Sequence, residues 1–401
     1  MNFNELGLEA HLVSRLKSLG LTRPTPIQAK AIPHALNGRD VLGIAQTGTG
    51  KTAAFGLPLV AALSGSRERP GPRTARGLIL APTRELATQI VRTLEGLTGD
   101  LRITLVVGGK SINAQVGKLA RGTDILVATP GRLIDLMDRR AVDLGRTRFL
   151  VLDEADQMLD IGFVHALRRI APMLGRDRQT MMFSATMPGQ MAELSREYLT
   201  DAVRVEASPP GKVADKVAHS VHFVAKEEKQ GLLIDLLDGH RDDRALVFSR
   251  TKHGAERLMK QLDRAGFAAA SIHGNKSQGQ RDRALDAFRA GSVRVLVATD
   301  VAARGIDIPG VGHVYNYDLP NVPENYIHRI GRTARAGRDG RAVAFCASDE
   351  MSELKAIEKV LGARVEIAGG VAWEAAVDTA KPSRPRRRRR RGGRRPDRLA
   401  A

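Results

Sequence analysis

One short segment, AQTGTGKT at residues 45–52, contains two glycines and ends in a lysine and a threonine. The segment follows an apolar run and precedes a helical pattern, as the phosphate loop GxxxxGK[ST] does, with alanine in place of the first glycine. Gly48 and Gly50 let the backbone approach a phosphate, which the loop amides and the helix start would bind. Lys51 would then reach the β- and γ-phosphates of a nucleotide, and the Thr52 hydroxyl would bind Mg²⁺.

Three carboxylates form a second chemical cluster further along the chain. The apolar run RFLVL is followed by Asp153, Glu154 and Asp156. Carboxylates after a strand often do no more than cap a helix. Beside a phosphate loop, however, Asp153 would hold Mg²⁺ through water, and Glu154 would polarise the water that attacks the γ-phosphate. The two clusters together predict hydrolysis of a nucleoside triphosphate.

Apolar runs that alternate with helical patterns must position these clusters. Five such runs lie between residues 77 and 186, and six more lie between residues 221 and 348. Strands that are apolar throughout are typical of a parallel sheet with helices on both faces, and their alternation with helices indicates βαβ units. Because such sheets bind ligands beyond the carboxyl ends of their strands, we expect the phosphate loop and the carboxylates at that edge.

A segment rich in turn-forming residues, EASPPGKVADK at 206–216, interrupts this alternation. We therefore predict two α/β domains joined by a linker, and the spacing of the runs RALVF, SIHG and VLVATD suggests that the second domain repeats the first. The predicted boundaries are a first domain at 1–206, a linker at 207–216, a second domain at 217–368 and a basic tail at 369–401.

The charge of the chain is concentrated at its C-terminus. The 401 residues include 63 Lys and Arg against 44 Asp and Glu, which gives a formal net charge of +19. Residues 381–401 hold eleven of the basic residues and one aspartate, and Arg386–Arg391 are consecutive. We expect a segment so poor in apolar residues to be disordered and to attract polyanions in a salt-dependent way, unless it only aids solubility.

Other features exclude whole classes of protein. The single cysteine, Cys346, excludes an intrachain disulfide and a zinc site built on cysteines. No apolar run reaches the ~18 residues that a membrane helix needs. The first residues, MNFNELGLEA, lack the basic start and the apolar core of a signal peptide. We therefore expect a cytoplasmic protein that does not bind membranes.

The order of the short motifs resembles that of the DEAD-box RNA helicases. Asp153-Glu154-Ala155-Asp156 spells the name of this family, and the resemblance extends from residue 3 to about residue 365. It implies two tandem RecA-like domains, each with a mainly parallel sheet and helices on both faces. It also implies an RNA-dependent ATPase that uses ATP and Mg²⁺, binds ATP and RNA between two closing lobes, and locally unwinds short RNA duplexes or remodels RNA–protein complexes.

The resemblance assigns a nucleotide site. Gln28 would read the adenine edge, Thr25 would support its loop, and Phe3 would stack on the adenine, or else only anchor the terminal helix. The other nucleotide-binding residues that it implies are Thr47, Gly48, Thr49, Gly50, Lys51 and Thr52 in the first domain and Gly305 and Asp307 in the second. Arg332 and Arg335, which an i, i+3 spacing places on one helix face, would reach the γ-phosphate as arginine fingers.

Hydroxyls, arginines and glycine amides at several loop–helix junctions suit contact with RNA phosphates. By resemblance, the RNA-binding residues are Thr83, Arg84, Gly108, Gly109, Thr129 and Arg132 in the first domain and Arg250, Arg283, Thr299 and Arg304 in the second. Arg283 is assigned here as the end of a Gln-x-x-Arg pattern that begins at Gln280. The stretch TPGR also fits a simple helix start that Thr129 caps.

Three further residues are assigned by resemblance to the coupling of hydrolysis to duplex separation. They are Ser184 and Thr186 in the first domain and His328 in the second. Chemistry alone describes the SAT stretch at 184–186 as a strand end with two hydroxyls. The coupling role therefore rests on the resemblance.

Two other functions fit the same motifs. One is an ATP-gated RNA clamp with little unwinding, although the intact Lys51 and Glu154 argue against an inactive ATPase. The other is a DNA translocase on a similar two-lobed fold. Contacts to the backbone that include the 2′-OH would favour RNA over DNA, with little sequence preference. By analogy with the family, RNA is the expected partner, and ribosome-assembly or RNA-decay proteins are further candidates.

Overall fold

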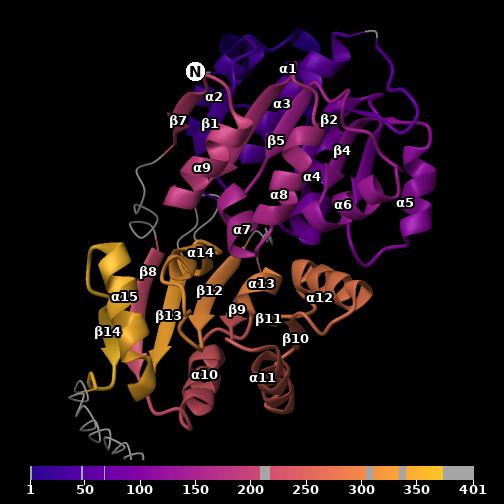
Figure 1. Cartoon of the computed structure of the whole chain (residues 1–401). Helices are drawn as coiled ribbons and strands as arrows, with labels where there is room; N and C mark the ends of the chain where they lie inside the picture. Colours follow the sequence, from indigo (N-terminus) through magenta and orange to yellow (C-terminus); the bar gives the residue numbers. More distant parts are fainter. Residues whose placement is uncertain are drawn as a thin grey trace, which may run out of the picture.

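The computed structural model describes residues 2–46, 48–66, 68–207, 217–303, 310–333 and 340–373. These residues form two lobes, one above the other in Figure 1, and each lobe is built on a seven-stranded sheet with helices on both faces. All strand pairs recorded for the described residues are parallel. The predicted α/β class with two tandem domains is confirmed.

The first lobe has the strand order β3-β4-β2-β5-β6-β1-β7. Its strands are β1 Val41–Ile44, β2 Ala75–Leu80, β3 Ile103–Val106, β4 Thr123–Ala128, β5 Phe149–Leu152, β6 Gln179–Ser184 and β7 Val203–Glu206. Its α-helices are α1 Ala10–Ser18, α2 Pro26–Leu36, α3 Lys51–Ser64, α4 Arg84–Thr98, α5 Ile112–Leu119, α6 Pro130–Asp138, α7 Ala155–Asp160, α8 Val164–Ile170 and α9 Gly189–Tyr198, and its 3-10 helices are η1 Phe3–Leu6 and η2 Ala171–Met173.

The second lobe has the order β10-β11-β9-β12-β13-β8-β14. Its strands are β8 Val217–Phe223, β9 Arg244–Phe248, β10 Ala269–Ile272, β11 Val295–Ala298, β12 Val311–Asn316, β13 Gly340–Cys346 and β14 Glu366–Gly369. Its helices are α10 Lys229–Asp238, α11 Lys252–Arg264, α12 Gln278–Ala290, α13 Asp300–Ala303, α14 Glu324–Ile330, η4 Ser348–Glu350 and α15 Met351–Leu361. Counted from the first strand of each lobe, both sheets have the same order, so the suggested repeat is confirmed.

The strands are apolar throughout because each sheet is covered on both faces. In β5, Phe149 and Val151 lie in the core under α1–α4, whereas Leu150 and Leu152 lie in the core under α5–α9. Successive strand side chains point to opposite faces, so both sets are removed from water. In the second lobe, α12–α15 cover one face and α10 and α11 cover the other.

The C-terminal part of the second lobe is held by an aromatic side chain. Trp373 is partly buried against the core, and its Nε1 donates to the Cys346 carbonyl at 3.0 Å. Cys346 itself is buried, as its position in an apolar strand predicts. Among the helices of the described residues, none is long and apolar enough to span a bilayer.

Candidate active site

The phosphate loop joins β1 to α3 with two left-handed glycines. Gly48 has φ 83° and Gly50 has φ 89°, a region that glycine adopts without steric cost. A Cβ atom on Gly50 would lie 2.5 Å from Nε2 of Gln28, so space as well as conformation requires glycine there. α3 begins at Lys51, which places the loop amides at a helix N-terminus, as an anion site requires.

Gln28 fixes this loop from α2. Its Oε1 accepts a hydrogen bond from the Thr25 amide at 3.0 Å, and its Nε2 donates to the Gly50 carbonyl at 3.0 Å. Both residues form a capping box at the start of α2. Phe3 is only 3% exposed and belongs to the core of the first lobe, so here it anchors the N-terminal segment. The adenine contacts of Gln28 and Phe3 stay predictions.

A buried ion pair lies beside the loop. Nζ of Lys51 is 3.6 Å from Oδ1 of Asp153, and both side chains are at most 5% exposed. Burial, and to a smaller extent the neighbouring Glu154 carboxylate, raise the pKa of Asp153 to about 6 against the opposing charge of Lys51. Two adjacent buried carboxylates supply the hard oxygen ligands that Mg²⁺ prefers, so they fit this ion.

Glu154 has an unusual backbone. Its φ is 53° and its ψ is 50°, the left-handed conformation, and the residue is the N-cap of α7. A non-glycine residue rarely adopts this conformation, and such strain tends to gather at functional sites. The side chain is 2% exposed, so its carboxylate lies in a low-dielectric environment. Its electrostatic interaction with a neighbouring charge or proton donor is stronger there than in bulk water.

Asp156 connects the carboxylates to the strand end at residues 184–186. Its Oδ2 accepts hydrogen bonds from the amides of Ala185 and Thr186, at 3.1 and 2.9 Å, and from the Thr186 hydroxyl at 2.9 Å. Ser184 Oγ donates to the Thr186 carbonyl at 2.6 Å. Sequence reasoning assigned no role to Asp156. The structure makes it the direct link between two predicted motifs.

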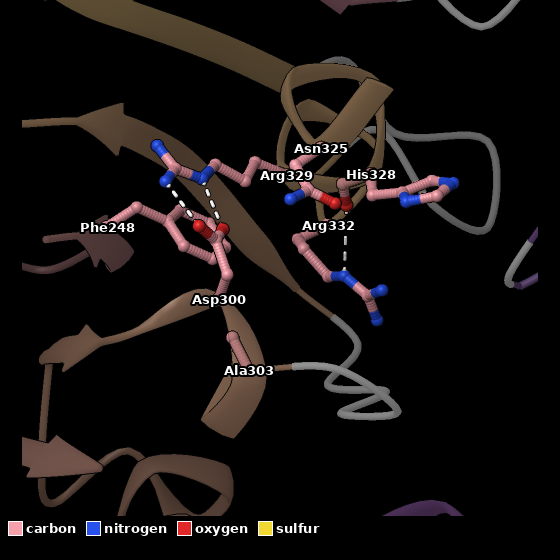
Figure 2. Close-up of a pocket in the computed structure, with 7 residues that line it drawn as sticks. All are labelled: Phe248, Asp300, Ala303, Asn325, His328, Arg329 and Arg332. Atoms are coloured by element: carbon pink, nitrogen blue, oxygen red, sulfur yellow. Dashed lines mark hydrogen bonds and ion pairs between the residues drawn. The ribbon is translucent and has the colours of Figure 1, made fainter. Parts of the chain in front are cut away.

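In the second lobe, two arginines at α14 have different roles: Arg329 lies in the helix, whereas Arg332 lies in the turn after its C-cap Gly331 and not on a helix face as the i, i+3 spacing predicted (Figure 2). Arg329 is 1% exposed, and its Nε and Nη2 bind both carboxylate oxygens of Asp300 at 2.6 and 2.7 Å. Its guanidinium also lies over the Phe248 ring, 4.9 Å from the centroid. Nε of Arg332 donates to the His328 carbonyl at 3.1 Å, and Figure 2 shows its guanidinium extending away from the Arg329 pair. Arg329 therefore positions α14, a role that sequence reasoning missed.

The predicted RNA residues of the first lobe come together at the carboxyl ends of its strands. Thr83 caps α4 by accepting from the Leu86 amide at 3.2 Å. Arg84 lies against the glycine loop after β3, since a Cβ atom on Gly109 would lie 2.4 Å from its Nη1. Arg132 Nη1 donates to the carbonyl of Lys110 at 2.9 Å. The neighbouring predicted residues are Gly108, in the same loop, and Thr129, the buried N-cap of α6.

The predicted RNA residues of the second lobe are more dispersed. The Arg250 amide donates to Asp318 Oδ2 at 2.8 Å, and its Nη2 binds Glu350 Oε1 at 2.9 Å. Thr299 lies between β11 and α13, and its amide donates to the Ile272 carbonyl. Arg283 is exposed on α12.

α12 carries a second Gln-x-x-Arg pattern, and this one lies at the contact between the lobes. Gln278 of α12 accepts a hydrogen bond from Arg84 Nη1 of α4 through its Oε1, and its Nε2 donates to Glu85 Oε1. Arg281 Nη2 forms an ion pair with the same Glu85 oxygen. All three distances are 3.1 Å. Gln280, in contrast, completes the capping box of α12. Burial and the charge of Arg281 lower the pKa of Arg84. A cavity of about 410 Å³ continues along α4 and α12 behind this contact.

Part of the predicted site lies outside the described residues: Thr47, Arg304, Gly305, Asp307 and Arg335, together with linker residues 208–216 and tail residues 374–401. The remaining predicted residues lie at loops and helix starts near the carboxyl ends of the two sheets, apart from Phe3 in η1, Ser184 at the end of β6, His328 in α14, Arg332 after α14 and Arg283 in α12.

Two family models match the chain. "DEAD/DEAH box helicase" covers residues 25–194, and "helicase conserved C-terminal domain" covers residues 228–337. The DEAD-box ATP-dependent RNA helicase CshA of Bacillus cereus is 42% identical over 359 residues, which are 89% of this chain and 67% of that protein.

Two solved structures share the fold. S. cerevisiae Dbp5 bound to RNA and ADP BeF3 superposes with a TM-score of 0.80 at 33% identity, over 92% of this chain and 95% of Dbp5. A DEAD box protein from Methanococcus jannaschii superposes with a TM-score of 0.53 at 37% identity, over 92% of this chain and 99% of that one.

Proposed function

Because this chain belongs to the DEAD-box helicase family and is an ATP-hydrolysing RNA helicase, we propose how it works. ATP and RNA bind between the two lobes, which close together, and the RNA-stimulated hydrolysis drives local unwinding of short duplexes or remodelling of RNA–protein complexes. The observation that carries this proposal is the lobe contact between Arg84 and Glu85 on α4 and Gln278 and Arg281 on α12. Residues of a predicted RNA motif in one lobe are there held by the other lobe.

The residues of the first lobe bind and activate the nucleotide. Thr52 and Asp153 hold Mg²⁺, which neutralises phosphate charge when bound. Lys51, which pairs with Asp153 at 3.6 Å, turns to the β- and γ-phosphates. Glu154 accepts a proton from the water that attacks the γ-phosphorus. From the second lobe, Arg332 and Arg335 supply positive charge to the γ-phosphate. Nε of Arg332 is held by its hydrogen bond to the His328 carbonyl.

The comparison of the two solved structures supports the closed arrangement. Dbp5 with RNA and ADP BeF3 superposes at a TM-score of 0.80, and the M. jannaschii protein at 0.53, although coverage and identity are similar. A difference of this size at equal coverage is expected when lobes of the same fold sit differently relative to each other. The higher score with the protein that holds RNA and nucleotide supports the proposed closed arrangement, in which the two ligands would be mutually coupled.

The C-terminal tail contributes to RNA binding through its positive charge. The basic tail raises the affinity for RNA by electrostatics, so removal of residues 381–401 should raise the RNA dissociation constant and lower its salt dependence. An unchanged dissociation constant and salt slope would refute the role of the tail.

We place the enzyme in the cytoplasm, where a lone cysteine stays reduced, with ribosome-assembly or RNA-decay proteins as partners.

The decisive experiment measures steady-state ATP hydrolysis with and without single-stranded RNA, beside a strand-separation assay. We expect RNA, and not a matched DNA strand, to stimulate hydrolysis and to be required for separation of a short duplex. RNA binding with neither stimulation nor separation would support the clamp instead. Equal stimulation by DNA would support the translocase.

The lobe contact gives a sharper test of closure. Arg281→Ala removes the ion pair with Glu85, so RNA-stimulated hydrolysis at subsaturating RNA should fall about tenfold, the worth of one charged hydrogen bond. ATP binding without RNA should not change, because the phosphate loop is untouched. The matched control is Arg264→Ala, which changes an exposed arginine at the end of α11 in the same lobe. If the two variants lose activity equally, the contact between Arg281 and Glu85 does not serve closure.

A further inference from the structure

Two histidines and an aspartate gather on the second lobe, away from the residues described above. His240 follows α10, Asp243 directly precedes β9, and His313 lies in β12, which pairs with β9 in the sheet. One ligand atom from each of the three lies within 4.8 Å of the others. Because β9 and β12 are parallel, this cluster lies at their amino ends, opposite the carboxyl ends that carry Arg250 and Asp318.

The distances in the cluster suit a shared ion. Nε2 of His313 lies 3.0 Å from Oδ2 of Asp243. Two ligands that bind one tetrahedral ion at about 2.0–2.2 Å are separated by about 3.3–3.6 Å, so this hydrogen-bonded pair has to open by only a few tenths of an ångström to admit an ion. The His240 and His313 rings are stacked, with centroids 3.4 Å apart and planes 3° from parallel. Binding of an ion by both rings requires them to tilt toward each other, which opens the stack.

His240 contributes the ring nitrogen Nδ1 as a candidate ligand. Its Nε2 lies 2.6 Å from the Tyr315 hydroxyl, whereas its buried Nδ1 has no hydrogen-bond partner among the residues that the structure describes. When Nε2 donates to the hydroxyl, Nδ1 keeps a lone pair in the interior, where an unsatisfied polar atom costs free energy.

We propose that His240, Asp243 and His313 form a site for a divalent transition-metal ion of the zinc class, with water in the fourth position. Two imidazoles and one carboxylate are a common set of zinc ligands, and nitrogen donors disfavour Mg²⁺, so this site differs in chemistry from the nucleotide site. The Tyr315 hydroxyl fixes the orientation of the His240 ring by binding its Nε2, which leaves Nδ1 for the ion. The ion would tie the loop after α10 to β12 and stabilise the second lobe.

The test uses the full chain without an affinity tag, free of nucleotide and of Mg²⁺. Zn²⁺ is titrated in competition with a chromogenic chelator, and Co²⁺ is titrated separately to record the d–d absorption of a tetrahedral site. The wild type is compared with His313→Asn and Asp243→Asn, and with the matched control His253→Asn, which changes an exposed histidine of the same lobe. Melting temperatures without metal show whether each variant folds.

The wild type and His253→Asn should bind one equivalent of Zn²⁺ that His313→Asn and Asp243→Asn lose, and Zn²⁺ should raise the melting temperature of the first pair alone. Tyr315→Phe should weaken binding about tenfold, as loss of an outer-shell partner does. RNA-stimulated hydrolysis should be the same in all of them, because the cluster lies at the opposite edge of the sheet. Equal Zn²⁺ stoichiometry and equal thermal response in wild type and folded His313→Asn would overturn the proposal.

Discussion

Arg332→Ala should lower RNA-stimulated ATP hydrolysis by about 10³-fold or more, the effect of losing an arginine finger in related NTPases. Arg332 is 5% exposed in the turn that follows α14, and its Nε donates a hydrogen bond to the His328 carbonyl. Its charge is therefore preorganised, and little reorganisation is needed when negative charge develops on the γ-phosphate. The loss should appear in kcat at saturating ATP and RNA, because the nucleotide is bound mainly by the first lobe.

Two companion variants of α14 separate chemistry from folding. Arg332→Lys keeps the charge but loses the planar guanidinium, so its activity should lie between wild type and Arg332→Ala. Arg329→Ala breaks the buried pair with Asp300 and should lower the melting temperature, because it leaves a carboxylate without its partner. Single-turnover hydrolysis measures the chemical step directly. Unchanged hydrolysis in a folded Arg332→Ala protein contradicts the role of this residue.

The strands that position the site could be predicted because both of their faces are buried. β5 is such a strand, and its apolar run places the carboxylates that follow it at the carboxyl edge of the sheet. β7 and β14 gave no such signal. Each is a four-residue edge strand. Val205 is the one buried side chain in these two strands and the others are exposed or half-buried, so their residues are not selected for apolarity on two faces.

The side-chain contacts could be predicted less well, because they depend on tertiary partners. α12 contains two overlapping Gln-x-x-Arg patterns, and the sequence does not say which one faces the other lobe; the structure selects Gln278 and Arg281. Phe3 illustrates the same limit, since its burial in the core depends on the packing of η1 against α1 and α2, which its own residue type does not reveal. Residue type and spacing therefore indicated the chemistry, while packing decided which of two similar residues faces the other lobe.

Glu154→Gln should lower kcat for ATP hydrolysis by about 10²–10⁴-fold, the usual contribution of a general base. The change keeps the shape of the side chain at a position that is 2% exposed and has a left-handed backbone, so the fold should be preserved. ATP binding should be preserved as well. The Glu154 charge raises the pKa of Asp153, and its removal therefore leaves Asp153 more readily ionised to hold Mg²⁺.

The combination of intact binding and lost hydrolysis is what identifies a base. Fluorescent ATP and RNA should bind Glu154→Gln with wild-type dissociation constants, and the ternary complex should dissociate more slowly because hydrolysis no longer ends it. Asp153→Asn is the contrasting variant, since loss of a metal ligand should weaken ATP binding in Mg²⁺ as well as hydrolysis. If Glu154→Gln binds ATP normally and hydrolyses it at the wild-type rate, another group activates the water. In that case, the strained backbone at Glu154 serves only to start α7.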